Sequence, residues 1–413
     1  MLKVPIPSAK SVLADVFVKT GSRQETPSIN GISHFLEHLF FKGSKKYPTA
    51  QALSHALDAI GASYNANTGK EHTQFYIKAA KKHLRFIFET LSDMLQHPVF
   101  AEDEIEREKG VIIEEINMYE DTPMRHVEDV LEEVMWPAHP LGRNIAGTRE
   151  VIRKITKKNI VDYVQTFYQP KNMIVSIAGA YSDKSLDDLI RKYWSGIVSK
   201  KVPAWQKVRE TQTQPAHKLE TKQTEQYHLA IGFRAYDFNH PSYVPSLVLA
   251  TILGGGMSSR LFTEVRERRG LAYYVRAQSG NYQDTGNFLI QAGIRKESLL
   301  EALQLILKEL QKIKNHKVEE RELAKAKEYI KGTLTLSLED SEALLGWYLE
   351  QIAFRKKILE PEQVFASIDR VTAADVQAVA SDLFRNEKMN VAVIGAEKEN
   401  AQLKKLLRVK SLL

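Results

Sequence analysis

The sequence predicts an α+β protein of two homologous domains from an internal duplication, each a mostly antiparallel sheet with helices packed on one side. One observation is that residues 154–180 and 370–396 align without a gap at an offset of 216. Both copies read as a capped helix, a turn and a buried strand that ends in glycine. The other observation is that helix and strand patterns occur in mixed runs within each half, which is typical of sheets layered with helices.

A second pair of segments supports the duplication. Gly61-Ala62-Ser63-Tyr64 corresponds to Gly270-Leu271-Ala272-Tyr273 at an offset of 209, and each lies between a predicted helix and a predicted strand. We therefore expect a first domain over 1–198, a polar linker over 199–216 and a second domain over 217–413.

The elements of the first half follow from their periodicities. Residues 11–19 alternate like a strand, with Val12, Ala14, Val16 and Val18 on one side. A helix follows Gly31 and Ser33, and Gly43 is expected to end it. Residues 72–77 read as another strand, and the apolar spacing from Leu84 to Leu95 predicts an amphipathic helix.

Composition excludes several classes of protein. The chain has 413 residues, 43% of them apolar, which is enough for two substantial cores. The net charge of +7 comes from lysines and arginines spread along helices, so we expect no nucleic-acid partner. There is no cysteine, and neither a signal peptide nor a membrane span is apparent, so we expect no membrane partner and a cytoplasmic location.

The stretch His34-Phe35-Leu36-Glu37-His38 is the strongest functional signal. On a helix, His34 and His38 lie on one face and can bind a single ion, and Glu37 lies nearly on the same face, where it can act on a water. This order is the inverted form of the common zinc-protease motif. Random placement gives only about 0.04 such matches. The alternative is an amphipathic helix with two ordinary histidines.

A catalytic zinc needs a third protein ligand and an open position. The acidic segment 106–116 reads as a helix whose one face carries Glu108, Ile112, Glu115 and Tyr119. The spacing alone does not choose between Glu114 and Glu115, although the apolar row favours Glu115. A solvated acidic helix is the alternative interpretation.

The motif, its distance from the acidic helix and several later segments resemble peptidase family M16, over nearly the whole chain. In that family the third zinc ligand is a glutamate about eighty residues after the first histidine, and Glu115 lies 81 residues after His34. The resemblance implies one zinc per chain held by His34, His38 and Glu115. It makes Glu37 the general base and Glu108 a supporting carboxylate. The start of the chain leaves little room for the family's usual first strand.

The resemblance also implies substrate contacts. Asn65 and Ala66 match a strand edge that pairs with the substrate backbone, although a plain loop is the simpler interpretation of these residues. In the second half, Arg266 and Tyr273 match an arginine and a tyrosine that reach toward the scissile carbonyl. An exposed arginine cluster with a packed tyrosine is the alternative there. The glycine-rich segment 254–261 lacks a phosphate-loop layout and is expected to be a turn.

The expected function is therefore that of a zinc metalloendopeptidase that cleaves peptides or unfolded segments inside a cavity formed by paired domains. Larger members of the family carry four such domains, so a chain with two is expected to form a homodimer or a heterodimer with a related subunit. The alternative function is that of a noncatalytic or regulatory subunit of an M16-type heterodimer. Such subunits normally lose part of the His-Glu-His set, and this chain keeps all of it.

Overall fold

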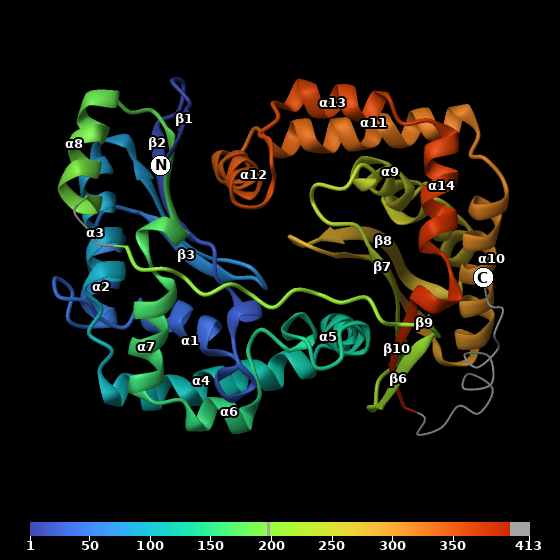
Figure 1. The fold of residues 1–413 in the computed structure, drawn as a ribbon, viewed down its shortest axis with the longest axis horizontal. Coiled ribbons are helices and arrows are strands. Elements are labelled where there is room, and N and C mark those ends of the chain that lie inside the picture. The colour runs from blue at the N-terminus through green and yellow to red at the C-terminus, as the bar shows by residue number, and fades with distance from the viewer. Residues whose placement is uncertain (196–198, 397–413) are drawn as a thin grey trace. The chain divides into compact units, whose positions relative to one another are not determined.

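The chain folds into two compact units, each with its own five-stranded sheet (Figure 1). The computed structural model describes residues 1–195 and 199–396. Unit 1 comprises residues 1–118, 143–206 and 338–353, and unit 2 comprises the rest of the chain. The predicted boundary at 198 and the last part of the predicted second domain, 397–413, lie outside the described residues. The predicted boundaries follow the duplication, whereas the units follow contacts, and each unit takes in a segment from the other half of the sequence.

The sheet of unit 1 has the order β1-β5-β2-β4-β3. β1 runs parallel to β5, and the other neighbours are antiparallel. The expected strand at 11–19 is β2, the one at 72–77 is β4, and the start of the chain forms a four-residue β1 at one edge. The strands are β1 (Leu2–Pro5), β2 (Ser11–Val18), β3 (Ser63–Thr68), β4 (Thr73–Ala80) and β5 (Met173–Gly179).

Helices pack on one face of this sheet, where α3 contacts β2 and β4, and α8 packs on α3 (Figure 1). The alternating residues Val12, Ala14, Val16 and Val18 of β2 face that core, as their spacing predicts. The helices in unit 1 are α1 (Ile32–Leu39), α2 (Ala50–Asp58), α3 (Leu84–Gln96), α4 (Glu102–Glu120), α6 (Arg149–Lys154), α7 (Lys157–Phe167), α8 (Asp183–Trp194) and α12 (Ser341–Phe354), of which α4 and α12 end just beyond the unit's limits.

The sheet of unit 2 repeats this topology strand for strand, in the order β6-β10-β7-β9-β8. The outer pair β6 and β10 is again parallel and the remaining pairs are antiparallel. The predicted α+β class with duplicated sheets is therefore confirmed. The strands are β6 (Ala216–Thr221), β7 (Gln226–Ala235), β8 (Ala272–Asn281), β9 (Gly286–Arg295) and β10 (Met389–Gly395).

The aligned segments fold alike. Thr156 begins α7 and Thr372 begins α14 (Ala373–Leu383), each with a capping box in which the threonine accepts from the third helical residue. Each helix then leads through a turn into a buried strand, β5 or β10. Gly61 and Gly270 both have a φ close to +60° and stand just before the edge strands β3 and β8. These glycines permit the same turn in both copies.

Unit 2 has helices on both faces of its sheet, which the sequence did not predict. α9 (Tyr243–Gly254), α10 (Leu299–Asn315) and α14 pack on one face with the main core, and α11 (Glu320–Ser337) and α13 (Pro361–Asp369) pack beside α9. The opposite face is covered by α5 (Pro123–Met135), which comes from the first half of the sequence (Figure 1). Gly232 of β7 permits this approach, because a Cβ there would lie 2.7 Å from Met135 Sδ.

Candidate metal centre

The predicted motif lies on the short helix α1, which packs against β3 and β4. Phe35, Leu36 and Leu39 are fully or almost fully buried in the core of unit 1. Burial of this apolar side fixes the rotation of the helix about its axis. His34 and His38, one turn apart, are left together on another side, with their rings 4.8 Å apart.

The third predicted ligand comes from α4. Ile105, Ile112 and Ile116 are buried along this helix, and Glu115 is directed toward α1. Glu115 Oε2 lies 3.6 Å from His34 Nε2 and 3.4 Å from His38 Nε2. Glu114, the alternative ligand, is exposed and accepts a hydrogen bond from Asn117. The structure therefore brings Glu115 together with the two histidines, and not Glu114.

The three side chains suit a zinc ion by chemistry and spacing. One ligand atom from each of His34, His38 and Glu115 lies within 4.8 Å of the others. In a tetrahedral zinc site with bonds of about 2.0–2.1 Å, ligand atoms are about 3.3–3.4 Å apart. The two distances to Glu115 are close to that value. Two imidazoles and one carboxylate form a known ligand set of catalytic zinc, one that leaves the fourth position open.

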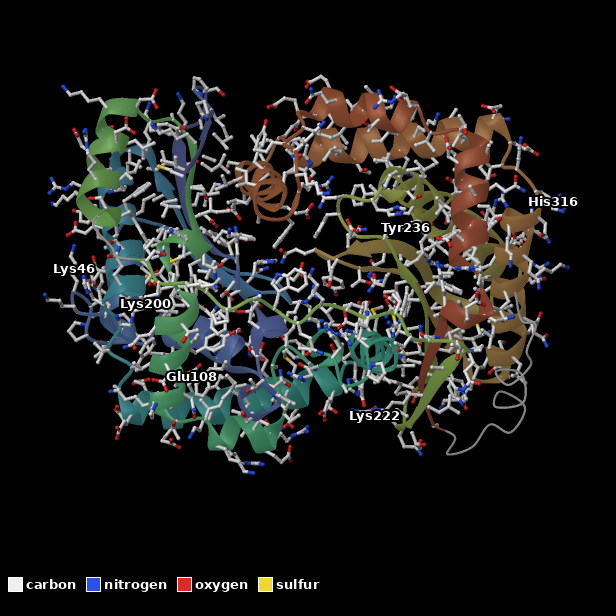
Figure 2. All side chains as sticks on the ribbon, viewed as in Figure 1. Lys46, Glu108, Lys200, Lys222, Tyr236 and His316 are labelled. Atoms are coloured by element: carbon white, nitrogen blue, oxygen red, sulfur yellow. The ribbon has the colours of Figure 1, made fainter. Side chains whose placement is uncertain are left out.

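Glu108, labelled in Figure 2, lies two turns before Glu115 on α4 and supports His38. Its Oε1 is 2.8 Å from His38 Nδ1, and its Oε2 is 2.7 Å from Lys42 Nζ. Burial raises the pKa of Glu108, but the hydrogen bonds with His38 and Lys42 outweigh burial and hold it below its ordinary value. The carboxylate therefore accepts the proton of Nδ1 and leaves Nε2 of His38 directed toward Glu115.

The pair of carboxylates also affects the charge of His38. Burial lowers the pKa of this imidazole, but its hydrogen bonds with Glu108 and Glu115 outweigh burial and raise the pKa to about 9. The site thus favours a positive charge between the two carboxylates. A metal ion that binds there takes the place of that proton.

Glu37 lies between the two histidines in sequence, and its carboxylate is held by the sheet. Thr68, the last residue of the edge strand β3, donates a hydrogen bond of 2.6 Å from Oγ1 to Glu37 Oε2. This contact orients the carboxylate that the sequence predicts to be the base. It also links the motif to the edge strand.

The other predicted residues lie on two separate strands and one helical turn. Asn65 and Ala66 are in β3, where the exposed Asn65 accepts a hydrogen bond of 2.9 Å from the backbone N–H of Ala66. Arg266 and Tyr273 belong to unit 2. Arg266 is exposed, with its guanidinium over the Phe262 ring, and Tyr273 is 63% exposed at a bulge of β8. Their predicted catalytic role stays a prediction.

Sequence reasoning missed three residues around α1. Lys42 pairs with Glu108, Thr68 bonds Glu37, and Glu25 accepts hydrogen bonds at the start of the helix. The sequence predicted a helix that ends at Gly43, in which Lys42 lies one turn after His38, so the spacing offered a signal for it, although α1 ends at Leu39. Thr68 and Glu25 meet the helix through tertiary structure and offered none. Burial raises the pKa of Glu25 to about 7, although Asn30, Ser33 and Gly31 lower it by hydrogen bonding.

Among the described helices, none is both long and apolar enough to cross a membrane.

Several known proteins with similar sequences are named as zinc proteases. The uncharacterised zinc protease YmxG of Bacillus subtilis is 35% identical over 381 residues, which cover 92% of each chain. An uncharacterised zinc protease of Streptomyces coelicolor is 33% identical over 400 residues, covering 95% of this chain and 87% of that one.

Solved structures agree with this likeness. A protease from Helicobacter pylori has a TM-score of 0.89 at 25% identity, covering 95% of this chain and 96% of that one. A protein described as a peptidase M16 inactive domain, from Pseudomonas fluorescens, shares the fold with a TM-score of 0.87. The sequence model of insulinase, peptidase family M16, matches residues 2–149, and that of the peptidase M16 inactive domain matches 154–330. Together these matches span most of the chain, which belongs to peptidase family M16.

Proposed function

We propose that this protein is a zinc metalloendopeptidase with one zinc per chain, held by His34, His38 and Glu115. The observation that carries the proposal is the separation of 3.4 and 3.6 Å between the Glu115 oxygen and the two imidazole nitrogens. These distances suit tetrahedral zinc, and the motif's own glutamate lies on the same helix. The relatives named as zinc proteases support the same chemistry.

Each side chain then has a distinct role in peptide hydrolysis. Zinc, when bound, supplies a Lewis acid that lowers the pKa of water in its open position to about 7. Glu37 accepts the proton of the attacking water and returns it to the leaving amine. Thr68 keeps the Glu37 carboxylate oriented for both transfers. Glu108 fixes the tautomer of His38, and Lys42 balances the charge of Glu108.

The proposed substrate is an extended peptide that adds a strand to β3. β3 is the outermost strand of its sheet, and its last residue bonds Glu37, so a peptide on this edge would run past the catalytic base. Asn65 and Ala66 are the proposed contacts. The backbone N–H of Ala66 donates to the Asn65 side-chain oxygen, and a carbonyl oxygen of the peptide would replace that oxygen as the acceptor. Backbone pairing of this kind recognises shape and demands little of the substrate sequence.

The residues of the other unit complete the proposal. Following the family pattern, Arg266 and Tyr273 would donate hydrogen bonds to the oxyanion that forms in the reaction.

The proposed domains divide the work. Residues 1–198 would form the domain that binds the metal, 217–413 the metal-free companion domain and 199–216 the linker between them. We further propose that two chains, or this chain and a related subunit, enclose the substrate, which light scattering tests. The cytoplasmic location stays a prediction from the sequence.

The test is cleavage of a quenched fluorescent peptide by wild type and by Glu37→Gln, with bound zinc quantified in both. Chelator-sensitive cleavage by wild type, with a Glu37→Gln variant that holds zinc but is inactive, is the expected result. Full activity in Glu37→Gln contradicts the proposal. Zinc binding without cleavage in either protein, alone and with candidate partner subunits, favours the noncatalytic alternative.

A further inference from the structure

The helix that carries the histidines has no capping side chain of its own. Gly31 is its N-cap residue and has a φ of +98°, a conformation that favours glycine. A Cβ at this position would lie 2.6 Å from the backbone oxygen of Ala146. The serine, threonine, aspartate or asparagine that usually caps a helix is therefore excluded here. The first backbone N–H groups of α1 need another acceptor.

Glu25 supplies that acceptor from six residues upstream. Its Oε2 accepts from the backbone N–H of Gly31 at 2.7 Å, and its Oε1 accepts from that of Ser33 at 2.8 Å. The Asn30 side chain donates a third hydrogen bond, of 2.8 Å, to Oε2. The residue is 3% exposed, so water does not replace these bonds. A carboxylate at this end of a helix also interacts favourably with the helix dipole.

The segment that carries Glu25 and Asn30 is itself held by the loop 143–147. Arg143 Nη1 donates to the backbone oxygen of Glu25 at 2.8 Å, and Asn30 Nδ2 donates to the backbone oxygen of Asn144 at 3.0 Å. Gly147 lies so close that a Cβ there would be 2.3 Å from the Asn30 oxygen. The start of α1 is thus set by a buried polar cluster and not by the helix alone.

We propose that Glu25 is a positioning residue for the metal centre, which fixes where α1 places His34 and His38 relative to Glu115. The inference rests on the proposed metal site. α1 has only eight residues, too few to be stable without external contacts. Ser33 donates its backbone N–H to Glu25 and immediately precedes His34. A metal site tolerates only about 0.2 Å of error in its ligand distances, so a small shift of the first turn weakens it.

The test compares zinc affinity in wild type, Glu25→Gln and Asp15→Asn by competition with a chromophoric chelator. Glutamine has one acceptor oxygen, so its amide NH₂ would face one of the two backbone N–H groups. We expect Glu25→Gln to bind zinc about 10–100-fold more weakly, as with other outer partners of metal ligands. Asp15 is the matched control, because it is an equally buried carboxyl of unit 1 bonded to Gln74 and Ser176, and not to α1.

A spectroscopic measurement separates positioning from general stability. Cobalt replaces zinc and reports its coordination geometry in its visible bands, which we expect to change in Glu25→Gln and not in Asp15→Asn. Equal zinc affinity and an unchanged cobalt spectrum in folded Glu25→Gln would overturn the inference. An equal loss in Asp15→Asn would overturn it as well, because the effect would then not depend on contacts at the start of α1.

If Glu25→Gln does not fold, Asn30→Ala decides the matter. That variant removes the bond from Asn30 to the Glu25 carboxylate, together with the bond to Asn144. A several-fold loss of zinc affinity in the folded variant supports the positioning role, and unchanged affinity rejects it. Wild type that binds zinc but cleaves no peptide removes the peptidase proposal and leaves this inference standing. Wild type that binds no zinc removes both.

Discussion

At the scale of single residues, the hydroxyl of Thr68 makes the hydrogen bond that orients Glu37, the proposed base. Thr68→Val keeps the shape of the side chain and removes the hydrogen bond of 2.6 Å to Glu37. We expect kcat to fall about tenfold, a part of the 10²–10⁴ that a general base contributes. Bound zinc should not change. Steady-state kinetics and zinc analysis measure both quantities.

Thr68→Ser is the matched control, since it retains the hydroxyl and should keep most of the activity. A Thr68→Val variant with unchanged kcat would show that Glu37 needs no such partner. A variant that loses zinc as well would instead place Thr68 among the supports of the metal site.

Asp15 gives unit 1 a pH-dependent stability. It is 1% exposed, and burial raises its pKa to about 7, although Gln74 and Ser176 lower it by hydrogen bonding. Because the folded-state pKa is raised, its stabilising contribution is complete below the unfolded value of about 3.9 and is lost as pH rises through 7. From pH 5 to pH 8 the wild type should lose about 3 kcal/mol through this group, at 1.36 kcal/mol per pH unit up to the pKa.

Asp15→Asn removes the titrating group and should flatten this part of the pH dependence. Urea unfolding at pH 5 and pH 8, with chelator present to exclude metal effects, measures the difference between the two proteins. Comparison with Asp15→Asn isolates the contribution of Asp15 from that of Glu25, which titrates in the same range. Parallel pH profiles for wild type and variant would contradict the expected role.

The residues that could be predicted are those whose partners are set by local spacing. His34, Glu37 and His38 follow one helical turn, and the row Glu108, Ile112 and Glu115 follows another. The facing of these two helices was supplied by the family resemblance. Glu25 and Thr68 could not be predicted, because no sequence periodicity relates them to α1. Glu25 contacts the helix from a preceding turn, and Thr68 contacts it from the end of β3.

At the scale of elements, two glycines of unit 1 differ in whether the structure leaves room for a side chain. Gly31→Ala introduces a Cβ 2.6 Å from a backbone oxygen at a φ of +98°, so we expect at least about 2 kcal/mol of destabilisation. Gly110→Ala lies in α4 with nothing within 4 Å of the new Cβ. It should stabilise unit 1 by about 0.5–1 kcal/mol, because alanine loses less conformational freedom in a helix. Denaturant unfolding of both variants measures the free energies.

These two substitutions control for each other, since each adds one methyl group to unit 1. Equal and small effects at both positions would mean that the start of α1 relaxes easily. That result would also weaken the case for a fixed capping geometry around Gly31.

The elements that the sequence predicted are those with a regular apolar pattern or an aligned copy in the other half, and the ones it left out are informative. α7 with β5 and α14 with β10 follow from the aligned sequences, down to the capping threonines. α5 and α12 were not placed, because each is grouped with the unit of the opposite half of the sequence. An amphipathic pattern shows that a helix buries one side, and it does not show which sheet that side contacts.

At the scale of the whole molecule, each unit has core residues of its own. The core around β2 and α3 belongs to unit 1, and the cores on the two faces of the second sheet belong to unit 2. The three candidate metal ligands all lie in unit 1. Metal bound at this proposed site would therefore stabilise the native state of unit 1 directly.

We expect chelator to destabilise unit 1 and to leave unit 2 nearly unchanged. Zinc at about a thousand times its dissociation constant adds about 4 kcal/mol to the unit that binds it. Hydrogen exchange followed by mass spectrometry assigns the effect, because peptides from β2 and β4 report on unit 1 and peptides from β7 and β9 report on unit 2. Chelator should speed exchange in the first pair alone.

Glu115→Gln provides the control for this measurement, since it removes the charged ligand from α4 and keeps its volume. In this variant, hydrogen exchange in unit 1 should be as fast as in chelator-treated wild type, whether or not zinc is added. Equal protection of both units by zinc would mean that the units unfold as one cooperative body. Protection of unit 1 that persists in Glu115→Gln would mean that zinc acts at a site other than His34, His38 and Glu115.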